Sequence, residues 1–183
     1  DLMSRVSYSM MNIDGCEKLS VAVRNGINKL LEEICNKANI SKERVLELII
    51  VGNPIMHHLL LGIDPSELGQ APFALAISQP VSFYSYQLNL NLNKNTQVSI
   101  LPCIAGHVGA DAAAVVLSET PNASKDVVLI VDVGTNAEIL LRNKDQLFAC
   151  SSPTGPAFEG AQISCGQRAA PGAIERVRID PET

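Results

Sequence analysis

The sequence predicts an α/β fold in which helices are layered on a sheet. Hydrophobic residues make up 46% of the 183 residues but aromatic residues only 4%, so the core must be aliphatic and rich in alanine. Such cores are typical of layered helix-and-sheet proteins. A helical period in residues 17–38 and a nearly continuous apolar stretch at 127–133 supply the two kinds of element. The length suits one domain or two small lobes.

The clearest helix is predicted over residues 17–38. Its apolar residues recur at three- and four-residue steps and make one stripe, opposite a charged face. The stripe consists of Leu19, Val23, Ile27, Leu30, Leu31 and Ile34. A short buried strand is predicted at 46–51. Pro54 suits the first turn of a second helix, and Gly62 suits its end.

The middle of the chain gives weaker signals. Residues 64–95 contain several prolines, and alternating Asn and Leu at 89–93 predict an exposed edge strand or hairpin. Another strand is predicted at 98–101. Residues 106–117 are predicted to form a helix rich in Gly and Ala, which would let a neighbouring element approach closely; a buried core helix explains them equally well. The stretch at 127–133 is predicted to be a central strand covered on both faces.

The charge and the cysteine pattern argue against several functional classes. A net charge of −5 with dispersed Lys and Arg disfavours nucleic acid as a partner. No apolar stretch approaches the ~20 residues of a membrane span, and no signal peptide is visible, so we expect a soluble, cytoplasmic protein with no membrane partner. His57 and His58 are adjacent and diverge on a helix, which favours packing over shared metal binding. The cysteines lack a C-x-x-C pair and are predicted to be small buried hydrophobes: Cys16, Cys35, Cys103, Cys150 and Cys165.

The strongest candidate site is an acidic residue at the end of the apolar stretch. Asp132 interrupts residues 127–133, where an unpaired carboxylate is costly and needs a cation, hydrogen bonds or water. Gly134 can expose consecutive N–H groups, while Thr135 and Asn136 add a hydroxyl and an amide. This pattern predicts a strand–turn–strand that binds phosphate while Asp132, the candidate catalytic residue, orients hydrated Mg²⁺ or water. An ordinary hairpin whose Asp caps the turn is the alternative.

Two flanking segments add candidates for nucleotide binding. Before the hairpin, His107 and Asp111 stand four residues apart and are expected either to share a helix face near a cleft or to cap the helix start. After it, a glycine-bearing loop enters a predicted helix, whose free N–H groups attract anions. Gly155 and Gly160 would close around the nucleotide. Glu159 would face nucleotide or Mg²⁺, or would be a solvated acid of the first turn.

The order of these elements resembles the second half of the nucleotide-binding domain shared by sugar and acetate kinases, heat-shock chaperones and actin. The resemblance implies a partial actin-like ATPase fold, ribonuclease-H-like in its sheet, with the hairpin as the second phosphate-binding motif. Residues 1–105 would be the end of the first lobe with a helical and irregular insert. Residues 106–183 would be the start of the second lobe with the phosphate-binding hairpin.

A closer resemblance covers most of the chain. Residues 51–65, 71–73, 106–111, 132–138 and 155–161 resemble the ATP-dependent reductive activators of corrinoid proteins. Members of that family drive an inactive Co(II) corrinoid back to Co(I), coupled to ATP hydrolysis. The resemblance implies ATP and Mg²⁺ as cofactors and a corrinoid protein as partner. It implies a [2Fe–2S] cluster only in an N-terminal domain of the longer parent, and a homodimer is one expectation for the assembly.

The same resemblance predicts that this chain is a fragment. A first phosphate motif, which the family carries upstream, is not found in these residues, so the fragment alone is expected to hydrolyse ATP poorly or not at all. Two alternatives remain. One is a non-catalytic interaction or assembly module with the same fold, and the other is a fragment of a small-molecule kinase, for which no acceptor base is recognisable.

Overall fold

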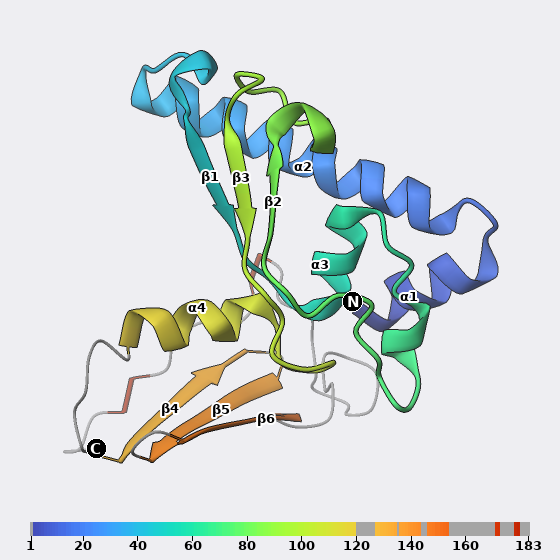
Figure 1. Ribbon diagram of the computed structural model, residues 1–183, viewed down its shortest axis with the longest axis vertical. Coiled ribbons are helices and arrows are strands. Elements are labelled where there is room, and N and C mark those ends of the chain that lie inside the picture. The colour runs from blue at the N-terminus through green and yellow to red at the C-terminus, as the bar shows by residue number, and fades with distance from the viewer. Residues whose placement is uncertain are drawn as a thin grey trace.

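The computed structural model describes residues 2–119, 127–134, 136–143, 146–153, 171–172 and 178–179, which contain two three-stranded sheets (Figure 1). The strands of the first sheet are β1 (Glu47–Ile50), β3 (Gln97–Ile100) and β2 (Val81–Tyr84), in that order. β1 runs parallel to β3, and β2 runs antiparallel to it. The carboxyl ends of β1 and β3 therefore lie at the same edge of the sheet.

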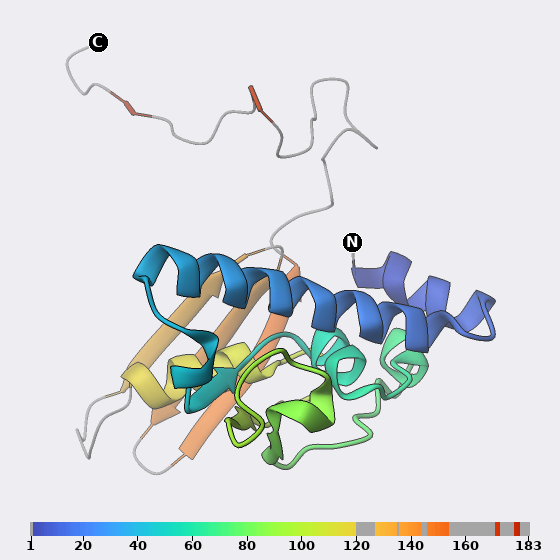
Figure 2. The same cartoon turned by 90° about the horizontal axis from the view of Figure 1, so that it is seen from above.

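Helices cover one face of the first sheet. The α-helices are α1 (Leu2–Met11), α2 (Gly15–Ala38), α3 (Pro54–Leu61) and α4 (Ala110–Glu119), and the short 3₁₀ helices are η1 (Lys42–Arg44), η2 (Ser66–Gly69) and η3 (Ser85–Leu88). Seen from above, α2 runs from η1 to α1 (Figure 2). Its Val23 and Ile27 pack on a core that includes Leu60, Val98 and Ile100.

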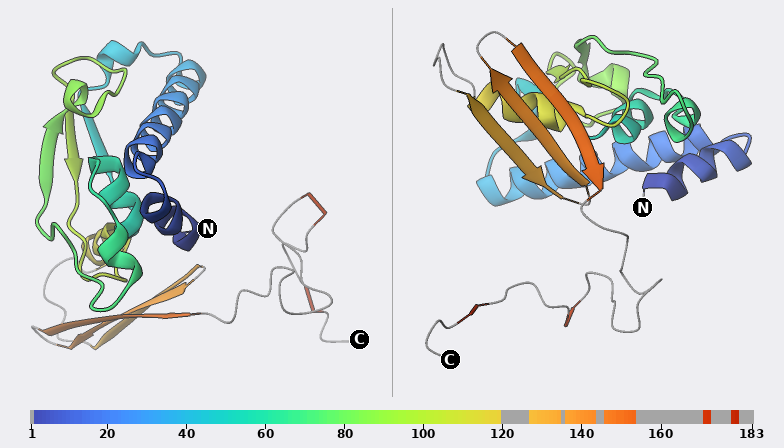
Figure 3. Two further views of the ribbon diagram at one scale, coloured as in Figure 1. Left: turned by 90° about the vertical axis from the view of Figure 1, so that its right-hand side faces the viewer. Right: turned by 90° about the horizontal axis from the view of Figure 1, so that it is seen from below.

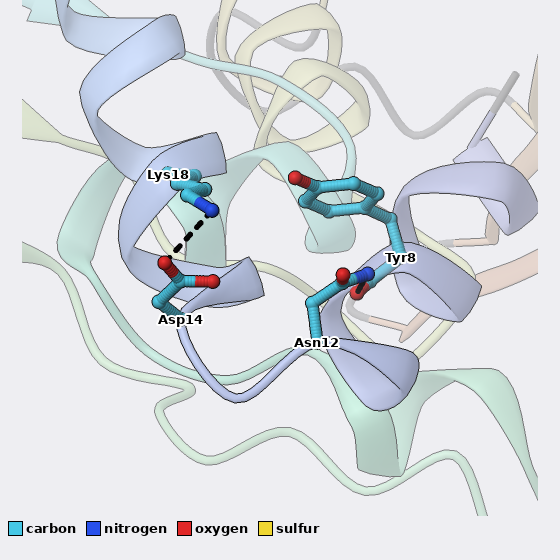
Figure 4. A network of polar contacts seen from close by, with 4 residues as sticks. All are labelled: Tyr8, Asn12, Asp14 and Lys18. Atoms are coloured by element: carbon cyan, nitrogen blue, oxygen red, sulfur yellow. Dashed lines mark hydrogen bonds and ion pairs between the residues drawn. The ribbon is translucent and has the colours of Figure 1, made fainter.

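The turn between α1 and α2 requires glycine. A Cβ at Gly15 would lie 2.6 Å from the carbonyl oxygen of Tyr8, because the two helices cross there. The Asn12 side chain donates a hydrogen bond to that same carbonyl at 2.9 Å, and Lys18 pairs with Asp14 at 2.8 Å across the first turn of α2 (Figure 4). The turn is held by these local contacts.

The prediction for α3 is confirmed at both ends. Asn53 caps the helix by accepting a hydrogen bond from the Met56 amide at 3.0 Å, and Pro54 occupies the first turn. Gly62 takes the left-handed conformation (φ 75°) that ends the helix.

The second sheet consists of β4 (Val128–Val133), β5 (Asn136–Asn143) and β6 (Gln146–Pro153), all antiparallel. One face packs on α4, where Leu140 is fully buried among Val108, Ala112 and Ile130. No described element covers the other face, which the view from below shows in front of α4 (Figure 3).

The prediction that residues 127–133 form a central strand covered on both faces is wrong. Among the strands that the structure describes, β4 lies at the edge of its sheet, and Leu129, Val131 and Val133 are 61%, 49% and 71% exposed. A continuous apolar run indicates burial on two faces, but in the described residues only the face carrying Ile130 has a partner.

Three smaller expectations also fail. Leu30 and Ile34 of the predicted helical stripe are exposed, because the buried face of α2 continues through Leu31 and Cys35 and leaves these two residues at its side. Residues 89–93 form no strand; they follow η3 in a turn, with Leu90 and Leu92 buried in the core. The helix predicted at 106–117 begins only at Ala110, since residues 105–108 form a tight turn closed by a bridge between Ala105 and Val108.

The prediction that the cysteines are buried is confirmed only in part. Cys35 and Cys103 are buried, and burial raises the pKa of the Cys103 thiol to about 11. Cys16 is half-buried, but Cys150 is exposed on the open face of the second sheet, contrary to the prediction, and Cys165 lies outside the described residues. Among the described residues, no helix combines the length and apolar character of a membrane span.

Candidate functional site

Asp132 lies one residue before the end of β4, at the edge of the second sheet. Its side chain is exposed and lines an open groove of about 440 Å³. Val115 and Glu119 of α4 form the opposite wall of this groove, and the rest of the lining is residues 128–131 of β4. Asp132 thus lies beside a concave surface, and phosphate binding there stays a prediction.

A second carboxylate, which the sequence analysis did not single out, faces Asp132 across the hairpin. Asp132 pairs with Glu138 of β5, and Glu138 pairs in turn with Ser151 of β6. The Ser151 hydroxyl donates a hydrogen bond to Glu138 Oε1 at 3.2 Å. By strand alternation this polar row lies on the face that carries Ile130 and Leu140 against α4. The register was available in the sequence, because Asp132 and Glu138 are equally distant from residue 135 in the predicted turn.

The two opposed carboxylates fit the donors that Mg²⁺ prefers. Like charges directly opposite one another destabilise a sheet, and a divalent cation between them would offset that repulsion. Mg²⁺ commonly binds through one or two carboxylates and keeps several waters. No group of three or more His, Cys, Asp or Glu side chains in the described residues could hold a metal ion. A cation at Asp132 and Glu138 would therefore complete its shell with water or phosphate oxygens.

The turn after β4 differs from the expected phosphate loop in its backbone. The Gly134 amide donates a hydrogen bond to the Asn136 carbonyl oxygen at 2.8 Å, so this N–H is used within the turn. Gly134 also does not adopt a left-handed conformation, contrary to our expectation of special backbone angles. A Cβ there would meet its nearest atom at 3.6 Å, an ordinary contact. Thr135 lies outside the described residues.

The remaining predicted site residues are not brought to this hairpin by any described contact. Gly155, Glu159 and Gly160 lie outside the described residues. Asp111 is in the first turn of α4, where its Oδ1 accepts a hydrogen bond from the Ala112 amide at 2.9 Å. His107 precedes the helix, so the two do not share a helix face, and nucleotide binding by Asp111 stays a prediction.

Three of the segments that carry the resemblance to corrinoid activators meet at one junction. Ala110, the first residue of α4, donates its amide hydrogen bond to the Gly52 carbonyl oxygen at 2.9 Å. A Cβ at Gly109 would lie 2.6 Å from that oxygen and 2.7 Å from Asn53 Cα. The backbones of residues 52–53 and 109–110 therefore touch directly, and only glycine at position 109 allows it.

The third segment closes this junction from another side. The rings of Phe73 and His107 lie 4.3 Å apart, and a Cβ at Gly106 would collide with the Phe73 carbonyl oxygen. Phe73 has a φ of 57°, a backbone conformation that residues other than glycine adopt at a cost in free energy. The three motifs can be recognised separately in the sequence, but only the structure shows that they converge.

The adjacent histidines of α3, for which we predicted packing in the core or at the surface, are both buried. His58 Nδ1 lies 2.8 Å from the Pro54 carbonyl oxygen, and His58 Nε2 accepts a hydrogen bond from the Ala76 amide at 3.1 Å. The ring therefore fastens the loop that follows Phe73 to α3. Burial lowers the pKa of His58 and of His57, and proximity to His58 lowers that of His57 further.

Comparison with known proteins accounts for both parts of the chain. Residues 1–121 match the family model of the RACo middle region, and residues 126–183 match the model of the C-terminal domain of RACo, the ASKHA domain. The expected α/β fold of the actin-like ATPase class is confirmed.

Individual relatives agree with these matches. The chain is 33% identical to a "corrinoid activation enzyme RamQ" of Eubacterium limosum over 177 residues, 97% of this chain and 30% of that protein. It is 40% identical over 80 residues, 44% of this chain and 15% of that protein, to a "[Co(II) methylated amine-specific corrinoid protein] reductase" of Methanosarcina barkeri.

A solved structure, titled "reductive activator for corrinoid, iron-sulfur protein", superposes with a TM-score of 0.80 and 38% identity, covering 98% of this chain and 28% of that one. The chain therefore spans about a third of the length of the relatives it matches across its full extent. With both family models and these relatives in agreement, the chain belongs to the RACo family of corrinoid reductive activators, in which it corresponds to the middle region and part of the ASKHA domain.

Proposed function

We propose that this chain is part of an ATPase module that reductively activates a corrinoid protein, returning inactive Co(II) to Co(I). The observation that carries the proposal is the pair of opposed carboxylates, Asp132 and Glu138, at the end of a hairpin in an ASKHA domain. The names of the relatives support the corrinoid protein as partner.

In this proposal Asp132 and Glu138 orient the waters of a bound Mg²⁺ or the water that attacks the nucleotide. Bound Mg²⁺ would neutralise the charge that develops on the phosphates. Gly134, Thr135 and Asn136 contact phosphate from the turn, and Gly155, Glu159 and Gly160 close around the nucleotide. The Gly134 amide would have to exchange its hydrogen bond to Asn136 for one to phosphate.

The role of ATP would be conformational and would involve no phosphorylated acceptor. A ligand shifts an equilibrium between two states only by its difference in affinity for them, and a nucleotide clamp can supply several kcal/mol of bias. The junction at Gly52, Phe73 and Gly109 joins α4, which packs on the hairpin sheet, to the first sheet. It is the candidate path along which a change at Asp132 would reach the rest of the protein.

The described cysteines do not fit an iron–sulfur cluster. A [2Fe–2S] cluster needs four grouped thiolates or imidazoles, and Cys16, Cys35, Cys103 and Cys150 form no such group. We therefore assign no redox step to these residues and propose that the electron carrier lies elsewhere in the longer protein.

We further propose that the boundary between the two lobes lies at residue 105 and that the protein is located in the cytoplasm. A homodimer is the candidate assembly. The open face of the second sheet, with Leu129, Val131 and Phe148 exposed, would be a contact surface for such an assembly.

One observation favours the non-catalytic alternative. The Gly134 N–H is already paired with Asn136, as in an ordinary hairpin that binds no phosphate. An interaction module of the same fold would keep this turn and bind its partner without regard to nucleotide.

Calorimetric titration of the complete protein with ATP, with and without Mg²⁺, separates the two. If the proposal is right, Asp132→Asn and Glu138→Gln each weaken MgATP binding by about tenfold or more, roughly the effect of one lost charge-assisted contact. ATP binding without Mg²⁺ should change little. Glu47→Gln, an exposed acid on β1, is the matched control and should leave both affinities unchanged. No measurable MgATP binding by the unaltered protein would support the interaction module, and identical MgATP affinity in all three variants would show that the two carboxylates do not contact the nucleotide.

A further inference from the structure

A second cavity lies between the helices and the first sheet, with a lining distinct from that of the groove at Asp132. It has a volume of about 210 Å³. Its walls include Val23 and Ile27 of α2, Met56 and Leu60 of α3, Ile50 of β1 and Ile100 of β3. These side chains are apolar, and the cavity lies at the edge where β1 and β3 both end.

One polar side chain lines this otherwise apolar space. His57 is 3% exposed, and neither of its ring nitrogens has a hydrogen-bond partner among the described residues. The Leu101 backbone lies near enough to the ring to raise its pKa, against the larger effect of burial, but the two do not have the geometry of a hydrogen bond. Buried polar groups are nearly always hydrogen-bonded, so each exception needs an explanation.

The neighbouring residue shows that the explanation is not a general lack of partners on α3. His58 is equally buried, yet both of its ring nitrogens are satisfied, one by the Pro54 carbonyl and the other by the Ala76 amide. The difference is that His57 lines the cavity and His58 does not.

The ring chemistry defines what the cavity can accept. Burial lowers the pKa of His57, so the imidazole is neutral near pH 7 and offers one N–H donor and one acceptor. The apolar walls exclude a charged molecule, because nothing there would compensate its lost hydration. A hydroxyl group can donate and accept, and so it matches either ring nitrogen. Engineered apolar cavities of about 150 Å³ bind benzene, so one six-membered ring fits here.

We propose that this cavity binds a small, uncharged, largely apolar molecule with a single hydroxyl group, which hydrogen-bonds to His57. Gly52 also lines the cavity, and its carbonyl oxygen holds the first amide of α4. A bound molecule would therefore contact the residue on which α4 is anchored. The proposal does not depend on nucleotide or corrinoid binding.

Phenol, with benzene as the comparison, is the probe, and ¹⁵N NMR of the histidine rings is the readout. Phenol should shift the His57 ring resonances saturably with one-site stoichiometry and should bind roughly three- to tenfold more tightly than benzene, the worth of one hydrogen bond. His57→Phe should bind the two equally. His107→Phe, the same change at an exposed histidine, should keep the preference for phenol.

Two results would overturn the proposal. One is a His57 signal that does not respond to millimolar phenol in the unaltered protein, which needs no variant to fold. The other is a His57→Phe protein that retains the preference for phenol. If His57→Phe does not fold, Ile27→Phe, which fills the cavity, must abolish the phenol response, and a persisting response would locate phenol elsewhere.

Discussion

At Gly134, a residue of the candidate site, the fold does not require glycine. Its backbone is not left-handed, and a Cβ would make only an ordinary contact with the Asn136 carbonyl oxygen. The fold should therefore accept alanine at this position. If a phosphate approaches the turn, however, the added methyl group would occupy the space that the phosphate needs.

We predict that Gly134→Ala in the complete protein changes the free energy of unfolding by less than about 1 kcal/mol, because the backbone fits alanine. The same variant should weaken MgATP binding severalfold. Thermal unfolding and calorimetric titration measure the two effects separately. Wild-type affinity in a stable variant would show that Gly134 does not contact the nucleotide.

His58 makes stability depend on pH. Burial lowers its pKa below the ordinary value of 6.5, so the folded protein resists protonation at a pH where the unfolded chain accepts a proton. Protonation would also turn Nε2 into a donor facing the Ala76 amide, itself a donor. The contribution is complete above pH 6.5 and is lost as the pH falls from there through the pKa of the folded state.

Denaturant unfolding should therefore show that the free energy of unfolding decreases as the pH is lowered from 7 to 5. His58→Gln should be less stable at pH 7 but should lose less stability on acidification. His57 adds to the slope in the same direction, so part of the effect should remain. If the free energy of unfolding of His58→Gln changed with pH as it does in the unaltered protein, His58 would have the same pKa in the folded and unfolded states.

The attachment of α4 to the first sheet rests on close backbone contact, which two glycines of the chain can test. A methyl group at Gly109 would collide with backbone atoms of Gly52 and Asn53, whereas a methyl group at Gly26, within α2, would meet nothing within 4 Å. Gly109→Ala should destabilise the protein by more than about 2 kcal/mol. Gly26→Ala should stabilise it by up to about 1 kcal/mol, because alanine favours helix. Equal unfolding midpoints of Gly109→Ala and Gly26→Ala would show that the backbones of residues 52–53 and 109 are not in close contact.

The elements that could be predicted are those fixed by local chemistry. The cap at Asn53, the proline at 54 and the glycine at 62 define α3 without help from the rest of the chain. The hairpin at 128–143 followed from its apolar runs and its turn residues. β2 was not predicted. Its four residues lie in a segment with several prolines, and nothing in the sequence indicates that they pair with β3.

The errors concern what each element packs against. An apolar run shows that a strand suits burial, but the sequence does not show whether a second layer covers it; in the part of the chain that the structure describes, β4 packs on α4 alone. At the candidate site Asp132 was predictable from its position in that run. Glu138 was predictable too, from the hairpin register about residue 135, whereas the hydrogen bond of the Gly134 amide to Asn136 could be seen only in the backbone itself.

At the scale of the whole molecule, nucleotide hydrolysis requires charges placed around the phosphates from several sides. This chain offers one acidic hairpin among its described residues. We predict that the 183-residue chain alone hydrolyses ATP at a rate near background. Phosphate release with MgATP tests this, and Asp132→Asn is the control. Robust Mg²⁺-dependent turnover that is lost in Asp132→Asn would show that the chain holds a complete site.

We propose above that nucleotide bound at the Asp132 hairpin drives reduction of a corrinoid partner. The direct measurement mixes the complete protein with a low-potential electron donor and a Co(II) corrinoid protein and follows Co(I) by absorbance. We predict that Co(I) accumulates faster with MgATP than without it, and that Asp132→Asn removes the difference while Glu47→Gln keeps it. Equal rates with and without MgATP, together with a complex whose affinity does not depend on nucleotide, would show that nucleotide does not drive the reduction.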